Sequence, residues 1–331
     1  MEPAEGLLLG SGAAVLLIQP RAMGDALLTT PLIRALKSNY PSCDIDFLAE
    51  SLPARLLRFN PHLREIFIAP QRGSQPWRYA PLLTRLIALR YRLAVDLIST
   101  PGSALLAYLT RAHVRVGYRL RGRSWAYTHP VPRRVEPIYN PATKFDLVAM
   151  LGLQPDNLSL DLVISDHIQN RSDKIWSELS LNPKTTVIGL APWSKREWRR
   201  WSLDAWGEFI KSASIEQNIT WLLFAGANER AELAGIERLN SARVVWASQS
   251  DILETAALIG RCKLLIGVDN GLKHIAVALG VPTLTIYTGS NPVVWNPPGM
   301  SIHRALVPKR EPLTAEELMI HLDGVLTGGR A

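Results

Sequence analysis

The sequence predicts an α/β protein made of two doubly wound, Rossmann-like halves, and three observations carry this prediction. Short apolar runs alternate with segments of helical periodicity along almost the whole chain, which is typical of parallel sheets covered by helices on both faces. At 331 residues the chain is long for one hydrophobic core and suits two domains. Polar loops follow strands in both halves, as expected where ligands bind at the carboxyl edge of an open sheet.

The clearest strand–helix–strand unit lies at residues 264–292. Its first apolar run, residues 264–266, has the length of a buried strand. Helical spacing follows over residues 272–279, and residues 283–287 form the next expected strand. Between strand and helix stand three turn residues able to cap the helix: Asp269, Asn270 and Gly271. Free N–H groups at this helix terminus would bind an anion, and a nucleotide diphosphate is the expected ligand.

The other expected elements alternate in the same way. In the first half we expect strands at 14–18, 44–48, 65–68, 94–98 and 114–117, with helices at 82–92 and 103–109. In the second half we expect strands at 186–190, 220–224 and 243–246, with helices at 203–210, 252–259 and 314–326. A polar linker region at 151–172 divides the chain into domains 1–160 and 161–331, and the terminal helix 314–326 could pack back on the first domain.

Composition and net charge limit the kinds of binding partner that we expect. Hydrophobic residues at 47% and charged residues at 20% exclude a disordered chain. The net charge of +8 favours an acidic partner: nucleic acid, an anionic membrane surface or a phosphorylated substrate. The two cysteines, Cys43 and Cys262, lie far apart in sequence, so neither a disulfide framework nor a cysteine metal site is expected, and a reducing cytoplasm fits.

An apolar stretch near the amino terminus, residues 6–18, is not expected to span a membrane or to act as a signal peptide. It is too short for a bilayer, and Glu2 and Glu5 stand where a signal peptide carries Lys or Arg. Contact with a membrane is therefore expected to be peripheral.

Residues 111–134, the arginine segment, contain seven arginines and no acidic residue: Arg111, Arg115, Arg119, Arg121, Arg123, Arg133 and Arg134. Aromatic residues are interleaved with them. Such a run can be a solvated face, but guanidinium groups without acidic partners repel one another unless an anion arrives. We therefore expect this segment to bind an anionic partner.

Several motifs, taken together and in order, resemble glycosyltransferase family 9. They are the loop Arg21–Asp25 followed by Leu28–Pro31, the strand Val95–Leu97, Val116–Tyr118 and the segment Val268–His274. The characterised members of this family are ADP-heptose:lipopolysaccharide heptosyltransferases. The resemblance implies a GT-B fold, in which two Rossmann-like domains face a central cleft. It also implies an acceptor-binding amino half, a donor-binding carboxyl half and catalysis without a metal or other cofactor.

The same resemblance assigns roles to single residues. Asp25 matches the catalytic base, although a carboxylate at a helix amino terminus is also favoured by the helix dipole alone. Asp269, Asn270 and Gly271 match the donor phosphate loop. His274, one turn into the helix, is expected to contact phosphate or sugar, with a buried core histidine as the alternative.

A second donor segment is expected at residues 193–206. Ser194 and Lys195 stand at the family's hydroxyl pair, Arg199 stands at its phosphate-binding lysine, and Glu229 matches the acidic residue expected to bind the donor ribose. The sequence also departs from the family pattern. Asn270 replaces a Ser or Thr, Lys273 replaces a small or apolar residue, and Asn291 lies in an altered closing motif at 288–292.

An Asp-x-Asp pattern, with which many glycosyltransferases hold a divalent metal, occurs at Asp44 and Asp46. It falls inside an expected strand, so solvated strand residues are the favoured interpretation. No metal site is predicted.

The leading hypothesis is an inverting, metal-independent transfer of heptose, or a related sugar, from ADP-heptose to the lipopolysaccharide inner core. Arg119, Arg121 and Arg123 would bind the anionic, lipid-linked acceptor at the cytoplasmic face of the inner membrane. The alternative enzyme is a sugar-nucleotide epimerase of similar fold, and the arginine segment speaks against it because an epimerase needs no basic acceptor face. A dinucleotide dehydrogenase is disfavoured because a Gly-x-Gly-x-x-Gly loop is absent after the first strand. A nucleic-acid-binding protein is disfavoured because no recognisable binding motif occurs. A non-catalytic family member stays open because of Asn270 and Asn291.

Overall fold

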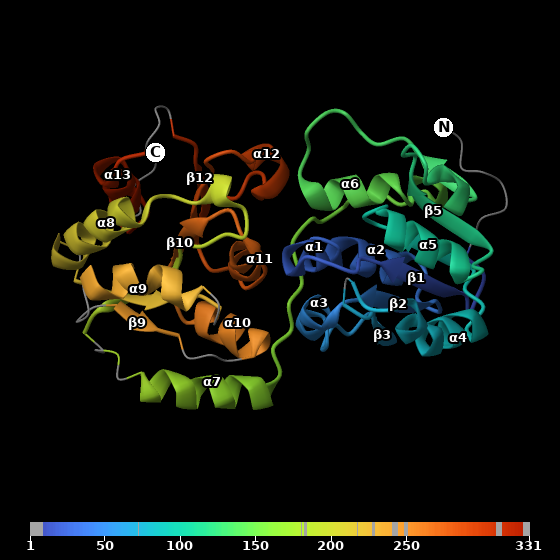
Figure 1. The fold of residues 1–331 in the computed structure, drawn as a ribbon, viewed down its shortest axis with the longest axis horizontal. Helices are drawn as coiled ribbons and strands as arrows, with labels where there is room; N and C mark the ends of the chain where they lie inside the picture. Colours follow the sequence, from blue (N-terminus) through green and yellow to red (C-terminus); the bar gives the residue numbers. More distant parts are fainter. Residues whose placement is uncertain are drawn as a thin grey trace. The chain divides into compact units, whose positions relative to one another are not determined.

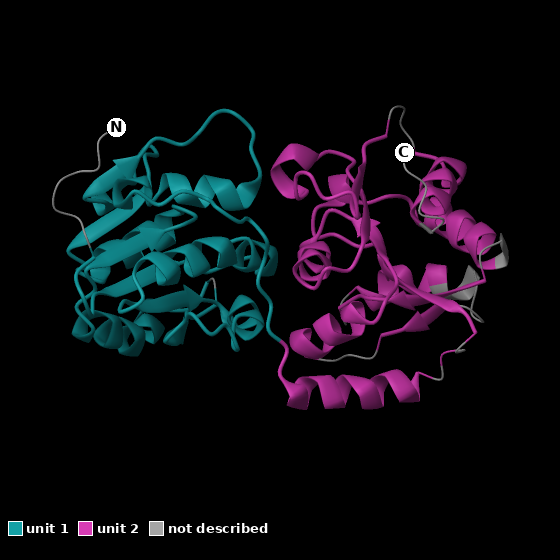
Figure 2. Cartoon of the chain, turned by 180° about the vertical axis from the view of Figure 1, so that it is seen from behind, with its two compact units in different colours: residues 1–163 teal, residues 164–331 magenta. Residues whose placement is uncertain are grey.

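The computed structural model describes residues 9–71, 73–179, 181, 184–216, 218–226, 229–239, 244–247, 251–308 and 313–326. The chain divides into two compact units, Met1–Val163 (unit 1) and Ile164–Ala331 (unit 2), shown in different colours in Figure 2. Within the described residues each unit holds one six-stranded sheet in which every ladder is parallel. Helices connect the strands and cover the sheets (Figure 1).

Unit 1 has the strand order β3-β2-β1-β4-β5-β6. Its strands are β1 (Ala14–Ile18), β2 (Asp44–Ala49), β3 (Glu65–Ile68), β4 (Leu93–Asp96), β5 (Val114–Tyr118) and β6 (His129–Val131). Its helices are α1 (Met23–Leu27), α2 (Thr30–Asn39), α3 (Ser51–Leu56), α4 (Ala80–Ala88), α5 (Pro101–Leu109) and α6 (Asn140–Asp146), with short 3-10 turns η1 (Pro76–Tyr79), η2 (Ser124–Ala126) and η3 (Ala149–Leu151).

Unit 2 repeats this arrangement with the order β12-β11-β10-β7-β8-β9. Its strands are β7 (Thr186–Ala191), β8 (Ile219–Leu223), β9 (Val244–Trp246), β10 (Leu265–Val268), β11 (Thr283–Ile286) and β12 (His303–Leu306). Its helices are α7 (Asp166–Glu178), α8 (Leu203–Glu216), α9 (Arg230–Leu239), α10 (Ile252–Gly260), α11 (Gly271–Ala278), α12 (Pro292–Trp295) and α13 (Ala315–Leu326), with the 3-10 turn η4 (Glu197–Arg199).

Each sheet reverses its order next to its first strand, which is the feature that positions the sites. The reversal lies between β1 and β4 in unit 1 and between β7 and β10 in unit 2. Loops on either side of such a reversal diverge and leave a crevice at the carboxyl edge. In unit 2 the two strands come very close, because a Cβ on Gly267 would lie 2.3 Å from the Ala191 carbonyl oxygen. Only glycine allows this approach.

The core of unit 2 is built on aromatic residues of α8 and its surroundings. Trp201, Trp206, Phe209 and Trp221 pack edge to face with neighbouring ring centroids 4.8–6.5 Å apart. Aromatic rings prefer this geometry because their positive edges meet negative faces.

The terminal helix α13 belongs to this same core. It packs against α8, and Leu318, Met319 and Leu322 are among its buried core residues. The helix is therefore part of the hydrophobic core of unit 2.

The expected strands and most expected helices are present, with ends shifted by a few residues. Position 243, the expected start of one strand, lies outside the described residues. The linker expectation at 151–172 is wrong in its second half, because α7 begins at Asp166. This helix is mostly polar and packs on α10 through few apolar side chains, so it gives little hydrophobic signal. Two further strands, β6 and β12, were not predicted because both are short and lie at sheet edges.

Candidate active site

Asn270 joins the two loops at the reversal of the unit 2 sheet. Its amide nitrogen Nδ2 donates to the carbonyl oxygens of Ala191 (3.2 Å) and Trp193 (3.0 Å), which end β7 and begin the next loop. Its Oδ1 accepts from the backbone N–H groups of Leu272 (3.0 Å) and Lys273 (3.3 Å) and so caps α11. The expected capping role is present, but these two N–H groups bind the cap rather than standing free for an anion.

The departure from the family pattern at Asn291 also has a local structural role. Its Oδ1 accepts from the Val293 N–H at 2.9 Å and caps α12. Both unusual asparagines therefore act as helix caps.

Asp269, directly after β10, is the centre of a buried charge cluster. Its carboxylate is 2% exposed and meets Arg199 at 2.9 Å and Lys273 at 3.1 Å. The Ser290 hydroxyl donates to the same carboxylate at 2.7 Å. A buried carboxylate is stable only when it is paired, and this one has two cations. Asp269 and Arg199, both expected to contact the donor directly, are thus bound to one another.

Lys273 is the residue of this cluster that sequence reasoning set aside as a departure. Its ammonium donates to Asp269, to the Tyr287 hydroxyl (2.8 Å) and to the Trp295 carbonyl (2.7 Å). Burial lowers the pKa of Lys273 to about 8, against the opposing effect of Asp269. The spacing Asp269–Lys273, i to i+4 at a helix start, was the signal that could have identified the pair.

The position of Arg199 is set by the loop after β11. Its guanidinium lies 4.8 Å from the centroid of the Trp198 ring. The Thr288 hydroxyl donates to the Trp198 carbonyl at 2.8 Å, and Gly289 has space for no side chain because its Cβ would lie 2.8 Å from the Trp198 ring. The altered closing motif 288–292 therefore fixes the turn η4 that carries Arg199.

His274 lies inside the protein next to this cluster. Its side chain is 4% exposed, and its Nδ1 is a buried atom without a hydrogen-bond partner among the described residues. Burial lowers the pKa of His274 well below its ordinary value, and Lys273 and Arg199 act in the same direction. The imidazole is therefore neutral at physiological pH, so any contact with a phosphate would be a hydrogen bond and not an ion pair.

Ser194 and Lys195 differ in exposure. Ser194 is buried, and its Oγ accepts from the Arg196 N–H at 3.3 Å, whereas Lys195 is exposed. A neighbouring network was not predicted: Arg200 lies over the Trp193 ring at 4.5 Å and pairs with Glu232 at 2.9 Å. This network fixes the backbone of the loop after β7.

Glu229 lies after β8, at the turn that precedes α9. Its carboxylate accepts from the Gly226 N–H at 2.7 Å, and its own N–H donates to the Gly226 carbonyl at 3.0 Å. The structure thus places Glu229 on a loop at the carboxyl edge of the sheet, where a ribose-binding acid is expected.

Asp25 of unit 1 lies in the first turn of α1 and not in the loop before it. A buried lysine, Lys144 of α6, acts on it electrostatically, and the Lys144 ammonium donates to the Leu97 carbonyl at the end of β4 (3.3 Å). Burial lowers the pKa of Lys144, while Asp25 and Asp96 raise it. The carboxylate thus lies at the reversal of the unit 1 sheet, beside a cation that the sequence did not point to.

The arginine segment is less free of partners than its sequence suggests. Arg134 pairs with Asp146 of α6 at 2.6 Å, and Arg123 donates to the Ser99 carbonyl at 3.0 Å. Arg119 donates a long bond of 3.4 Å to the Pro130 carbonyl. Arg119 and Arg121 are exposed, Arg123 is half-buried, and no ion pair to these three is present among the described residues.

The two carboxylates of the Asp-x-Asp pattern pair with the same arginine and differ in exposure. Asp46 is fully buried, pairs with Arg64 and accepts from the Tyr91 hydroxyl at 2.7 Å. Asp44 pairs with the same Arg64 at 2.6 Å. The expectation that both are solvated is wrong for Asp46, because β2 is an inner strand and Arg64 supplies the missing charge.

Within the described residues, no three His, Cys, Asp or Glu side chains gather as a metal-binding set. Across the same part of the chain, no helix is both long and apolar enough to cross a membrane.

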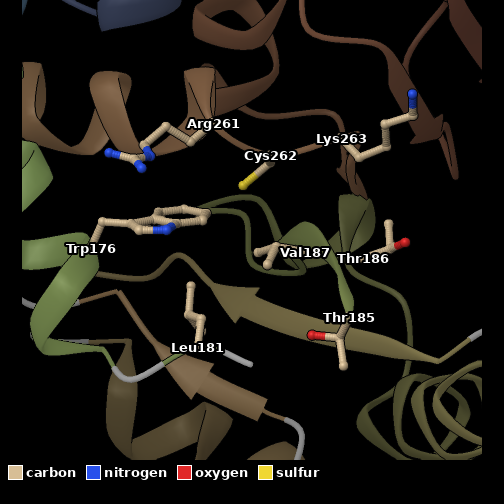
Figure 3. Close-up of a pocket in the computed structure, with 8 residues that line it drawn as sticks. All are labelled: Trp176, Leu181, Thr185, Thr186, Val187, Arg261, Cys262 and Lys263. Carbon is tan, nitrogen blue, oxygen red and sulfur yellow. The ribbon is translucent and has the colours of Figure 1, made fainter. Parts of the chain in front are cut away.

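A surface pocket of about 610 Å³ in unit 2 is lined by none of these residues (Figure 3). It is lined by Trp176, Leu181, Thr185, Thr186, Val187, Arg261, Cys262 and Lys263. Thr186 and Val187 begin β7, so the pocket is at the amino edge of the sheet, opposite to the edge where open α/β sheets bind ligands.

Two Rossmann-like units, one with a carboxylate and one with a cationic cluster at the carboxyl edge, define a protein of the GT-B glycosyltransferase class. Residues 80–317 match glycosyltransferase family 9 (heptosyltransferase), so the chain belongs to this family and is a glycosyltransferase. Lipopolysaccharide heptosyltransferase 3 of Escherichia coli K12 is 25% identical over 296 residues, which cover 84% of this chain and 83% of that protein.

Two solved structures show the same fold. ADP-heptose lipopolysaccharide heptosyltransferase II of E. coli aligns with a TM-score of 0.79 at 22% identity, over 96% of this chain and 100% of that chain. The E. coli heptosyltransferase WaaC with ADP aligns with a TM-score of 0.72 at 19% identity, over 96% and 99%. The GT-B prediction is confirmed.

Proposed function

We propose that the protein is an inverting glycosyltransferase that moves heptose, or a related sugar, from ADP-heptose to the lipopolysaccharide inner core without a metal. Its relative and the two solved neighbours act in lipopolysaccharide heptose transfer or bind ADP, as their names state. The observation that carries the proposal is the Arg199–Asp269–Lys273 cluster, which has two cations for one carboxylate. Its net positive charge, at the carboxyl edge of a Rossmann-like sheet, suits a diphosphate.

Asp25 is the proposed base of the reaction. It takes the proton of the acceptor hydroxyl as that oxygen attacks the anomeric carbon of the donor sugar. The bond from this carbon to the diphosphate breaks on the opposite face, ADP leaves, and the configuration inverts. Lys144 favours the charged form of Asp25 through the interaction that raises its own pKa.

The donor is held by unit 2. Arg199 and the exposed Lys195 bind the diphosphate and offset the charge that develops as ADP leaves. Ser194, Asn270 and Gly271 line the phosphate loop, and Glu229 binds the ribose. Neutral His274 donates a hydrogen bond to a phosphate oxygen or forms one with a sugar hydroxyl. No resident cofactor is proposed.

The acceptor is held by unit 1, through Arg119, Arg121 and Arg123. Phosphates and carboxylates of a lipid-linked saccharide are the anions that guanidinium groups bind best. The same unit exposes Tyr108 and Trp125, whose rings pack edge to face at 5.2 Å, with Arg115 over Tyr108 at 5.6 Å. Exposed aromatic residues beside arginines favour peripheral binding to the cytoplasmic face of an anionic membrane.

The direct test is transfer by the purified protein. ADP-heptose and a heptose-deficient lipopolysaccharide are the substrates, with other sugar nucleotides offered in parallel. The proposal expects a mass gain of one heptose on the acceptor and an inverted anomeric linkage by NMR. Transfer from a different nucleotide sugar only would contradict the donor assignment, and retention of configuration would contradict the mechanism.

A further inference from the structure

Lys273 joins three chain segments at a single buried ammonium group. It contacts Asp269 at the end of β10, Tyr287 directly after β11 and the backbone carbonyl of Trp295 in α12. An ammonium group has three donors, so these contacts use all of them. The side chain is 2% exposed, which leaves it no room to meet a donor diphosphate directly. Its role must therefore be exerted through its neighbours.

The neighbour that matters is Asp269, whose two oxygens divide between two cations. Oδ1 faces Lys273, and Oδ2 faces Arg199 and the Ser290 hydroxyl. Arg199 is 23% exposed, so it is the one of the two cations that reaches solvent. Without Lys273, Arg199 would be the only cation paired with the buried Asp269 carboxylate. Moving the Arg199 guanidinium towards a ligand would then leave that carboxylate unpaired, which costs much free energy.

We propose that Lys273 is a positioning residue, which neutralises Asp269 so that the Arg199 guanidinium is available to the donor diphosphate. The inference rests on the proposed function, because it assigns Arg199 to the diphosphate. It goes beyond it by placing an additional, fully internal cation in donor binding.

The charge of Lys273 makes this device dependent on pH. The charged groups around it are Asp269 and Arg199. The other titratable groups near it are the imidazoles of His274 and His303, whose pKa values are lowered, and the Tyr287 hydroxyl in contact with it. Because the pKa of Lys273 is lowered to about 8, the ammonium form dominates below that pH and is lost above it. Affinity for a nucleoside diphosphate is thus expected to fall as pH rises through about 8. The bound anion shifts the midpoint upward, since it favours the charged lysine.

Calorimetry with ADP on the full-length protein tests the inference. Lys273→Met keeps the length of the side chain and removes its charge, and we expect it to weaken ADP binding by about tenfold at pH 7. The double variant D269N/K273M removes both charges, which releases Arg199, and should recover ADP affinity to within about threefold of wild type. The fall of affinity above pH 8 should disappear in both variants. Lys263→Met, an exposed lysine at the amino edge of the same sheet, is the matched control.

Several results would overturn the inference. One is wild-type affinity in K273M, and another is a folded double variant that binds ADP as weakly as K273M. Circular dichroism and thermal unfolding confirm that each variant is folded, and the double variant tests the idea even if K273M alone is unstable. UDP and GDP run in parallel separate the two proposals. If the wild type binds one of them in place of ADP, the donor assignment fails. The effect of Lys273 on nucleotide affinity is then measured with the nucleotide that binds.

Discussion

At the scale of single residues, several polar side chains of the candidate site are already bound to other groups of the protein. Both the nitrogen and the oxygen of the Asn270 amide form hydrogen bonds to backbone groups. The Asp269 carboxylate pairs with two cations and accepts a hydrogen bond from a hydroxyl. A buried polar group costs free energy unless it is paired, so such networks hold one geometry. In the proposed function, a donor would therefore bind to side chains that are already in position, and little binding energy would be needed to order them.

Asp25→Asn is expected to abolish transfer while folding and donor affinity are kept. Loss of a general base lowers the rate by about 10² to 10⁴, and an amide cannot take the acceptor proton. Steady-state kinetics and ADP calorimetry on the same preparation measure both effects. Asp204→Asn, which changes another first-turn acid on an exposed helix start, is the control for a helix-dipole effect. Near wild-type turnover in D25N would remove Asp25 from the mechanism.

Asn270→Ala is expected to lower thermal stability more than Asn291→Ala. Losing a helix cap costs about 0.5–2 kcal/mol, and only Asn270 also satisfies the carbonyls of Ala191 and Trp193. Scanning calorimetry of the two variants compares a cap that also joins two strands with a cap that does not. Equal losses would mean that the bonds to the end of β7 contribute nothing.

At the scale of elements, short segments at the sheet edges do the positioning. The turn η4 carries Arg199 and is held by Thr288 and Gly289 of the loop after β11, some ninety positions later in the chain. The helix α5 exposes Leu105 and Tyr108, and the Tyr108 ring packs against Trp125 of η2, which lies within the arginine segment. Residues 71–134 contain one acidic residue, Asp96, which is buried. All the Lys and Arg residues of this stretch are arginines.

The triple variant R119A/R121A/R123A is expected to raise the acceptor KM and to weaken binding to anionic vesicles. The donor Kd should change little, because these arginines are on unit 1 and the proposed diphosphate loops are on unit 2. Kinetics at varied acceptor and ADP calorimetry separate the two effects.

A charge-matched variant of unit 2, K174A/K211A/K263A, removes three exposed lysines and is the control for net charge. If the arginine variant loses donor affinity as strongly as acceptor affinity, the division of labour between the units is wrong.

At the scale of the whole molecule, transfer is expected to continue in excess EDTA. In the proposed mechanism Arg199 and Lys195 supply the positive charge that a divalent metal would otherwise bring to the leaving diphosphate. Activity assays with EDTA, and with Mg²⁺ or Mn²⁺ added back, measure this directly. Full loss of activity in EDTA with recovery on adding metal would contradict the metal-independent mechanism.

The sequence by itself determined the parts of this protein that depend on local spacing. Apolar periodicity located the parallel strands, and a polar turn after residues 264–266 located the cap Asn270, because a cap bonds residues two and three positions away. Motif order was enough to predict the family and its GT-B fold, both now established. The predicted roles of Asp25, Glu229 and the other site residues stay predictions.

The tertiary structure alone decided which charges meet. Arg199 and Asp269 are seventy positions apart, and Lys144 reaches the Leu97 carbonyl across forty-seven. Asp46 is buried because β2 lies inside its sheet and Arg64 accompanies it. The physical reason is that desolvation and ion pairing depend on which segments the fold brings together, whereas periodicity records only which face of a segment is apolar. A lysine that looked like a departure from a motif is thus the buried counter-charge of Asp269.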